Sequence, residues 1–375
     1  MRNFTNVLTS LATILTAALL TTASVAAAKV EEIKFLGQVT FPTDTQFENT
    51  PVGGLSGITY DSRKKVYYSI SDDRSERSPA RFYTLRIDIS SEKLNKVEFI
   101  DVTTLLNSEG QPFAPLSLDP EGIALTEDNT LYISSEGDPK LEIMPFVNRF
   151  SLEGKQLQIL LVPNKFLPAI ERGVRSNLAF ESLTISPNQR FLYTATENAI
   201  VQDGSEATIS TGSPSRILQY DLTRGQPKKE FLYFVDPVAT TPNPPDSFST
   251  NGLVELLSLG KDRFLSLERS FSTGIGNAIK LYQVSLEGAE DISQIESLTN
   301  IDLRQIRAAK KKLLLDLADL NITLDNVEGI TFGPCLADGR RSLILVSDNN
   351  FSPTQTTQVL AFSVQTEPNR CPVPH

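Results

Sequence analysis

The chain has 375 residues, 40% of them hydrophobic and 21% charged, so it is long enough for one large β domain or two ordinary domains and can bury a real core. Its net charge of −10 argues against a nucleic-acid partner, because binding to a phosphate backbone needs a basic face. The only histidine is the last residue, His375, which excludes Ser–His–Asp and Cys–His catalysis and histidine-ligated zinc or iron.

Residues 1–28 have the features of a secretory signal. Arg2 supplies positive charge, Leu11 to Leu20 form a short apolar stretch, and three alanines at 26–28 offer a cleavage site. The apolar stretch is too short and too weak to span a membrane. We therefore expect a periplasmic or secreted protein with no membrane contact after cleavage, and a mature domain over residues 29–375.

Five segments repeat one pattern along the chain. They are GLSGITYD (54–61), DPEGIALT (119–126), AFESLTIS (179–186), NGLVELLS (251–258) and NVEGITFG (326–333). Each is followed, after a polar turn, by an apolar run that ends in acid: VYYSISDD (66–73), LYISSEGD (131–138), FLYTATEN (191–198), RFLSLERS (263–270) and LILVSDNN (343–350). Such a repeat is typical of a β-propeller, here all-β with five four-stranded blades. A sixth, poorly marked blade within the long loops is the alternative.

The last repeat is one strand short, and Val30 to Phe41 has the character of the missing strand. Pairing of this segment with Thr357 to Val364 would close the ring through the two termini. In the fourth repeat we predict Gln294 to Leu298 as the outer strand and Leu303 to Leu320 as an amphipathic surface helix. The two cysteines, Cys335 and Cys371, predict one disulfide that ties the C-terminal tail to the last repeat. We expect a monomer.

Acidic residues recur where the repeats meet. Because neighbouring strands of a blade are antiparallel, the start of the first strand and the end of the second lie at one edge. The first position carries Glu121, Glu181, Glu255 and Glu328, with Ser56 in the first repeat, and the second carries Asp72, Asp73, Glu136, Glu197, Glu268 and Asp348. A ring of hard oxygen donors is the ligand type that calcium prefers. We therefore predict a calcium site held by the four glutamates. The alternative is structural, with carboxylates that hold backbone N–H groups and pair with arginines.

Two acids are each followed closely by an arginine. We predict that Arg74 and Arg269 orient an anion and that Asp73 or Glu268 acts as general base, since no nucleophile–histidine pair is present. The loops Asn107 to Leu118, Asn164 to Leu178 and Asp236 to Thr250 are expected to overhang this mouth.

These motifs, from GGLSGITYD to LILVSDNNF, resemble the phytase-like domain family, also described as "esterase-like activity of phytase". The resemblance runs from Gly53 to Phe362 and implies an exported, propeller-like protein with ester or phosphoester hydrolysis. The leading hypothesis is a calcium-assisted hydrolase of phosphate esters or other small esters, with a small anionic ester as substrate. The alternatives are a non-catalytic propeller that binds a protein, glycan or metal at the same mouth, and a calcium-dependent lactonase.

Overall fold

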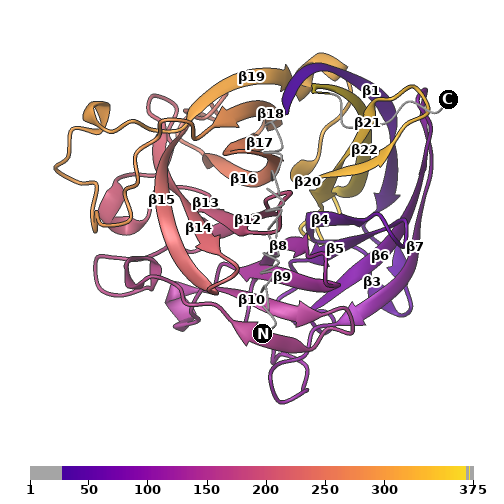
Figure 1. The fold of residues 1–375 in the computed structure, drawn as a ribbon, viewed down its shortest axis with the longest axis horizontal. Helices are drawn as coiled ribbons and strands as arrows, with labels where there is room; N and C mark the ends of the chain where they lie inside the picture. The colour runs from indigo at the N-terminus through magenta and orange to yellow at the C-terminus, as the bar shows by residue number, and fades with distance from the viewer. Residues whose placement is uncertain (1–27, 369–370, 372–375) are drawn as a thin grey trace, which may run out of the picture.

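A computed structural model describes residues 28–368 and Cys371. Within this part of the chain, five four-stranded antiparallel sheets are arranged around a central axis, which confirms the five-bladed propeller (Figure 1). Apart from Ala28, the predicted signal segment lies outside the described residues. None of the helices in the described part has both the length and the apolar character needed to cross a membrane.

The blades follow the chain in order, with the first strand of each nearest the axis. Blade 1 consists of β4 (Leu55–Asp61), β5 (Val66–Ser71), β6 (Arg81–Ile89) and β7 (Leu94–Thr104). Blade 2 consists of β8 (Pro120–Leu125), β9 (Thr130–Ser135), β10 (Phe146–Ser151) and β11 (Gln156–Ile159). Blade 3 consists of β12 (Phe180–Ile185), β13 (Phe191–Thr196), β14 (Ser213–Asp221) and β15 (Gln226–Val235). Blade 4 consists of β16 (Ser249–Gly260), β17 (Arg263–Ser272), β18 (Gly276–Ser285) and β19 (Lys310–Asp316).

Blade 5 is built from both ends of the chain, as predicted. It consists of β20 (Asn326–Cys335), β21 (Arg341–Asp348), β22 (Thr356–Glu367) and, on the outside, β1 (Lys29–Pro42). The strand β1 pairs with β22 from Lys29 opposite Glu367 to Pro42 opposite Thr356. The predicted disulfide joins Cys335 at the end of β20 to Cys371. The ring is thus closed by backbone hydrogen bonds between distant parts of the chain.

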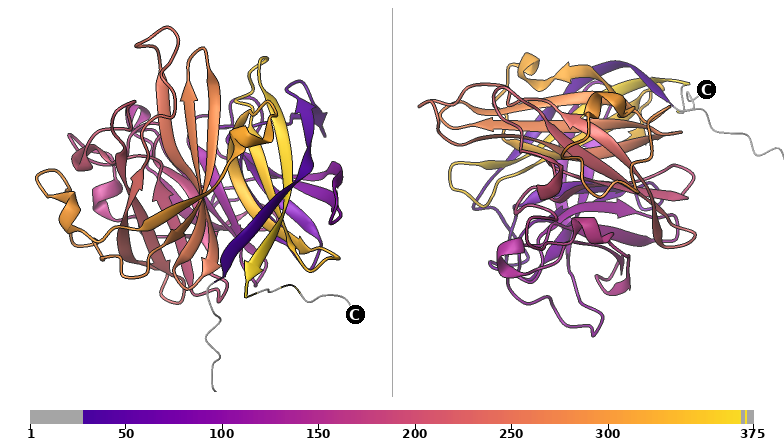
Figure 2. Two further views of the ribbon diagram at one scale, coloured as in Figure 1. Left: turned by 90° about the horizontal axis from the view of Figure 1, so that it is seen from above. Right: turned by 90° about the vertical axis from the view of Figure 1, so that its left-hand side faces the viewer.

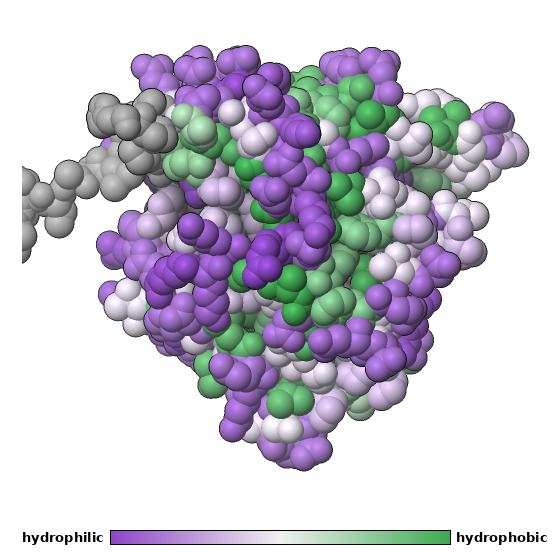
Figure 3. Space-filling view, turned by 90° about the vertical axis from the view of Figure 1, so that its right-hand side faces the viewer, coloured by the Kyte–Doolittle hydropathy of each residue, from purple (hydrophilic) through white to green (hydrophobic). Residues whose placement is uncertain are grey.

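The other elements are short. A two-stranded hairpin, β2 (Gln46–Phe47) with β3 (Thr50–Pro51), precedes the first blade. In the described residues, five 3₁₀ turns lie in the loops: η1 (Pro139–Leu141), η2 (Asn164–Phe166), η3 (Val201–Asp203), η4 (Leu303–Gln305) and η5 (Leu317–Leu320). On the side where β1 and β7 lie, hydrophilic and hydrophobic residues are intermixed, as is usual for outer strands (Figure 3).

Two predictions for blade 4 are wrong. The segment Leu303–Leu320 is not a helix, because its middle is the outer strand β19, flanked by η4 and η5. Residues 294–298 are not a strand, and Leu298 instead packs with Leu232 and Ile292 in a small buried cluster. The open edge of β18 offers hydrogen-bond partners to Lys310–Asp316, and this long-range pairing outweighs the local helical pattern.

Candidate functional site

The five inner strands each begin with an irregularity. Pairing with the second strand shifts register between Leu55 and Gly57, Pro120 and Ile123, Phe180 and Ser182, Leu253 and Glu255, and Val327 and Gly329. The residues at the start of these bulges are Ser56, Glu121, Glu181, Val254 and Glu328. A bulge re-aims the side chain of the unpaired residue, and Glu121, Glu181 and Glu328 all line a cavity at this end of the axis.

A second set of side chains comes from the ends of the second strands. On each second strand, one residue directly follows the residue that pairs with the inner strand just before its bulge. These five residues all line the same cavity, and they are Asp72, Glu136, Glu197, Arg269 and Asp348. Four of the five blades therefore present an acid at this position, and blade 4 presents an arginine.

The cavity has a volume of about 700 Å³ and is strongly acidic. Its acidic lining residues are Asp72, Glu121, Glu136, Glu181, Glu197, Asp325, Glu328 and Asp348, and Arg269 is the one cationic residue among the described residues that line it. At the opposite end of the inner strands lies a smaller cavity of about 260 Å³, and Arg341 is the one charged residue among the described residues that line it. The repeats thus gather acids at one mouth of the channel, as the sequence predicted.

The tightest group of acids belongs to blade 2. Carboxylate oxygens of Asp119, Glu121 and Glu136 all lie within 4.8 Å of one another, and all three residues are buried. Burial raises the pKa of Asp119 to about 7, although the Arg74 guanidinium 3.6 Å away opposes this shift. Burial, and then the neighbouring acid Glu181, raises the pKa of Glu121 well above its ordinary value. Without a further positive charge, this trio holds protons near neutral pH.

Two cavity-lining acids also have oxygens without hydrogen-bond partners. Glu197 is 1% exposed, and its Oε1 accepts no hydrogen bond, with only the Arg269 guanidinium 3.6 Å away. The Oδ1 of Asp72 is likewise buried and unpartnered. Burial raises the pKa of Glu197 to about 7 and that of Asp348 to about 8. An ionised carboxylate that is buried without partners lowers the stability of the fold unless a cation or a proton neutralises it.

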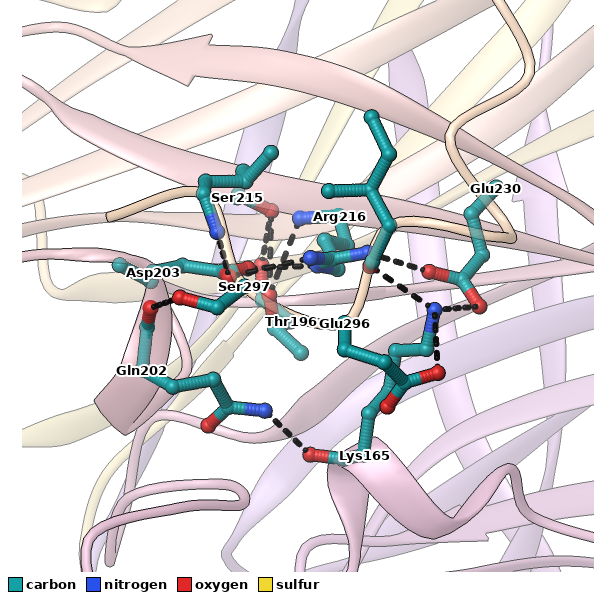
Figure 4. Close-up of polar contacts among 12 residues, drawn as sticks. Lys165, Thr196, Gln202, Asp203, Ser215, Arg216, Glu230, Glu296 and Ser297 are labelled. Carbon is teal, nitrogen blue, oxygen red and sulfur yellow. Dashed lines mark hydrogen bonds and ion pairs between the residues drawn. The ribbon is translucent and has the colours of Figure 1, made fainter. Parts of the chain in front are cut away.

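A second buried cluster shows how the same protein satisfies charge elsewhere (Figure 4). Arg216 is bonded to Asp203 at 2.5 and 3.0 Å and to Glu230 at 2.7 Å, and Lys165 lies 3.3 Å from Glu230. Two buried cations there face two buried acids, and the exposed Glu296 lies 3.9 Å from Lys165. This balance is typical of a structural ion network, whereas the acids of the mouth far outnumber their cations.

The structure places three of the predicted site residues away from the cavity. Glu255 follows the bulge residue Val254, so its side chain points to blade 3, where it accepts a hydrogen bond from the Leu183 N–H at 2.8 Å. In blade 1 the matching position is Gly57, where an added Cβ would lie 2.6 Å from the Glu121 carbonyl oxygen. The position after the bulge is therefore a contact between inner strands rather than part of the mouth.

Asp73 and Glu268 are similarly displaced by one residue from the cavity-lining positions. Asp73 pairs with Arg81 at 2.8 Å and accepts hydrogen bonds from three backbone N–H groups of the following loop. Glu268 contacts Lys311 and accepts hydrogen bonds from Tyr233 at 2.7 Å and from the Asp236 N–H. Their roles as general bases therefore find no geometric support. Both carboxylates are bonded to cations and backbone N–H groups, and neither lines the cavity.

The two predicted arginines have different settings. Arg269 lines the cavity and is bonded to Glu328 at 3.0 Å. Arg74 lies beside the blade 2 trio, between Asp119 at 3.6 Å and Asp138 at 3.0 Å. Two of the three predicted overhanging loops contribute lining residues, namely Asn177 and Leu178 from one and Phe248 and Thr250 from the other.

Two features of the site were not predicted from the sequence. Asp119 stands directly before the second repeat's inner strand, and its place in the motif DPEG was the available signal. Phe248 and Phe271 form an apolar wall in blade 4, for which the sequence offered no distinguishing pattern.

Comparison with known proteins gives one family and several distant similarities. The model of the family described as "Phytase-like: Esterase-like activity of phytase" matches residues 50–351. An uncharacterized secreted protein of Arthroderma benhamiae is 27% identical over 217 residues, which cover 50% of this chain and 40% of that protein. The chain therefore spans less than half the length of the curated relative that it matches.

Solved structures with similar folds are remote in sequence. The periplasmic gluconolactonase PpgL of Pseudomonas aeruginosa has a TM-score of 0.36 and 10% identity, with 92% of this chain and 100% of that chain covered. The gluconolactonase XC5397 of Xanthomonas campestris has a TM-score of 0.33 and 11% identity, with 90% and 98% covered. The Dos1 propeller has a TM-score of 0.31 and 8% identity, with 84% and 68% covered. The family match extends over most of the five blades, and the chain belongs to the phytase-like family, described as having esterase-like activity of phytase.

Proposed function

We propose that the acidic mouth binds a hard divalent cation, calcium, and that the protein is an exported, metal-assisted hydrolase of small esters. The observation that carries the proposal is the buried trio Asp119, Glu121 and Glu136, whose oxygens lie within 4.8 Å of one another. Calcium takes six to eight oxygen ligands with loose geometry, which suits carboxylates from a bulge and a strand end. The unpartnered oxygens of Glu197 and Asp72 favour a cation in the same cavity.

The ligand set differs from the four glutamates expected from the sequence. Glu121 remains, with Glu181 beside it, and Asp119 and Glu136 join it because they lie closest. Glu328 is held by Arg269 at 3.0 Å and by the Asn326 side-chain amide at 2.9 Å, so we assign it to positioning Arg269.

A bound divalent cation would polarise the ester carbonyl and lower the pKa of a bound water. Hydrolysis consumes one water: its oxygen bonds to the acyl carbon, the acyl C–O bond breaks, and the alcohol leaves with a proton. In this chain, lining carboxylates that are not ligands would accept the proton from water, and Arg269 would stabilise negative charge that develops on the acyl oxygen. Export is supported by the signal-like residues 1–28 and by the secreted relative.

The test combines metal analysis with an activity assay. Protein purified without chelator should contain calcium, and its hydrolysis of 4-nitrophenyl acetate should be lost on adding EDTA and restored by calcium. The double variant Glu121→Gln and Glu136→Gln should lose both metal and activity. Glu153→Gln, an exposed acid of the same blade, is the matched control and should keep both. Metal-free protein with chelator-resistant hydrolysis would refute the proposal.

A non-catalytic, cation-binding propeller is the second candidate. It is favoured by the absence, among the described residues that line the cavity, of any histidine or cysteine that could serve in covalent catalysis. Calcium binding without any chelator-sensitive ester hydrolysis would support this candidate over the first.

A further inference from the structure

One wall of the acidic cavity is aromatic. Phe248, directly before β16, and Phe271, near the end of β17, both line it, with ring centroids 6.1 Å apart and planes inclined by 37°. At this end of the propeller, the strands β16 and β17 of blade 4 project beyond the neighbouring blades (Figure 2, left). Phe248 is 68% exposed, so its ring is accessible at the rim of the polar cavity.

The rest of the lining is poorly suited to a polyanion. Arg269 is the one cationic residue among the described lining residues, and its guanidinium is engaged by Glu328 at 3.0 Å and Glu197 at 3.6 Å. A single divalent cation would bring two positive charges to a cavity lined by eight acidic residues. A ligand with several phosphate groups would therefore meet net repulsion at the mouth.

The two walls suit the two ends of one ligand. The acid trio lies on blade 2 and the aromatic pair on blade 4, and a cavity of about 700 Å³ is within the range that holds a small molecule. Uncharged polar groups, including Asn177, Asn277 and Thr250, also line it and can hydrogen-bond a neutral ligand.

We infer that the substrate is an uncharged ester with a flat, apolar-faced ring, which packs on Phe248 while the ester group lies over the acid trio. The inference rests on the proposed function for the position of the ester group, and it narrows the substrate from esters in general to uncharged ones. Stacking on an exposed aromatic ring removes apolar surface of both partners from water.

The chain contains no tryptophan, so the variant Phe248→Trp has a single tryptophan that reports on this wall. The probes are 4-nitroacetanilide and 4-nitrophenyl phosphate, which share a quenching ring and differ in charge. We expect saturable quenching by the uncharged probe, with at least tenfold weaker binding of the phosphate. The matched control is Phe234→Trp, an exposed phenylalanine on β15, which should show no saturable quenching. Equal or tighter binding of the phosphate, or the same quenching in both variants, would overturn the inference.

A second variant separates this inference from the proposed function. Phe248→Ala should raise KM for 4-nitrophenyl acetate about tenfold with little change in kcat, and should leave KM for methyl acetate nearly unchanged. Saturable quenching without chelator-sensitive hydrolysis would support ring binding at Phe248 and refute the proposed hydrolase activity. Chelator-sensitive hydrolysis with an unchanged KM in Phe248→Ala would refute the ring site and keep the hydrolase.

Discussion

At the scale of single residues, one position along a strand decides whether an acid belongs to the mouth. Successive side chains of a strand point to opposite faces, so an error of one residue moves a side chain to the other side. Asp73 and Glu268 are each one position away from cavity-lining Asp72 and Arg269, and Glu255 is one position after the bulge residue Val254. The sequence showed acids at every repeat but could not show the bulge that sets their register, because a bulge depends on pairing between strands.

Because of this register, a substitution of Glu255 can be compared with substitutions of the acids that line the mouth. Glu255→Gln keeps an oxygen that can accept hydrogen bonds from the Leu183 and Leu256 N–H groups, so calcium stabilisation should be unchanged. Glu121→Gln should abolish the stabilisation by calcium. Thermal melting with and without calcium measures both variants, and loss of the calcium shift in Glu255→Gln alone would contradict the assignment.

Asp73 should behave as a structural residue. Asp73→Ala leaves the buried Arg81 guanidinium without its carboxylate and should lower the free energy of unfolding by about 3–5 kcal/mol. Denaturant unfolding measures this loss. At low temperature, where the variant is fully folded, it should keep its kcat for 4-nitrophenyl acetate. A kcat lowered by orders of magnitude would instead support the prediction that Asp73 is the general base.

At the scale of elements, the number of blades and their closure follow from repetition, which is visible in one sequence. The strand β1 could be recognised because the fifth repeat lacked a partner for β22. The outer strand β19 could not, because Lys310–Asp316 is a strand only through its pairing with β18, and the lysines and leucines around it also suit a helix. Local pattern thus predicts the inner strands better than the outer ones.

The buried ion network holds an insertion of blade 4 against blade 3, and this can be tested. Arg216 contacts Asp203 and Glu230, while the Lys165 ammonium donates to the Ser293 carbonyl at 2.6 Å. Arg216→Leu leaves two buried carboxylates without their main partner, and the free energy of unfolding should fall by about 3–5 kcal/mol. The calcium-induced rise in Tm should persist. A variant as stable as the parent would show that the network is dispensable.

At the scale of the whole molecule, the excess of acids at one mouth links stability to pH. Burial raises the pKa of Asp119 and Glu197 to about 7 and that of Asp348 to about 8, against about 4 in an unfolded chain. Between about pH 4 and pH 8 the unfolded chain has therefore released protons that the folded, metal-free protein still holds. The free energy of unfolding without metal should fall as pH rises through this window.

Calcium competes with these protons, so its stabilising effect should grow as pH rises from about 5 to about 8. Melting curves at several pH values, with EDTA and with calcium, measure both trends. At a free calcium concentration 100 times Kd the stabilisation should be about 2.7 kcal/mol. A metal-free protein whose Tm rises with pH over this range would contradict the account.

The claim on which the rest depends is that the buried acids Asp119, Glu121 and Glu136 of blade 2 form a cation site at the channel mouth. Calorimetric titration of chelator-treated protein with calcium at about pH 8 tests it most directly. We predict saturable binding accompanied by proton release, lost in the double variant Glu121→Gln and Glu136→Gln and retained in Glu153→Gln. Absence of saturable binding in the parent protein, or unchanged binding in the double variant, would contradict the account.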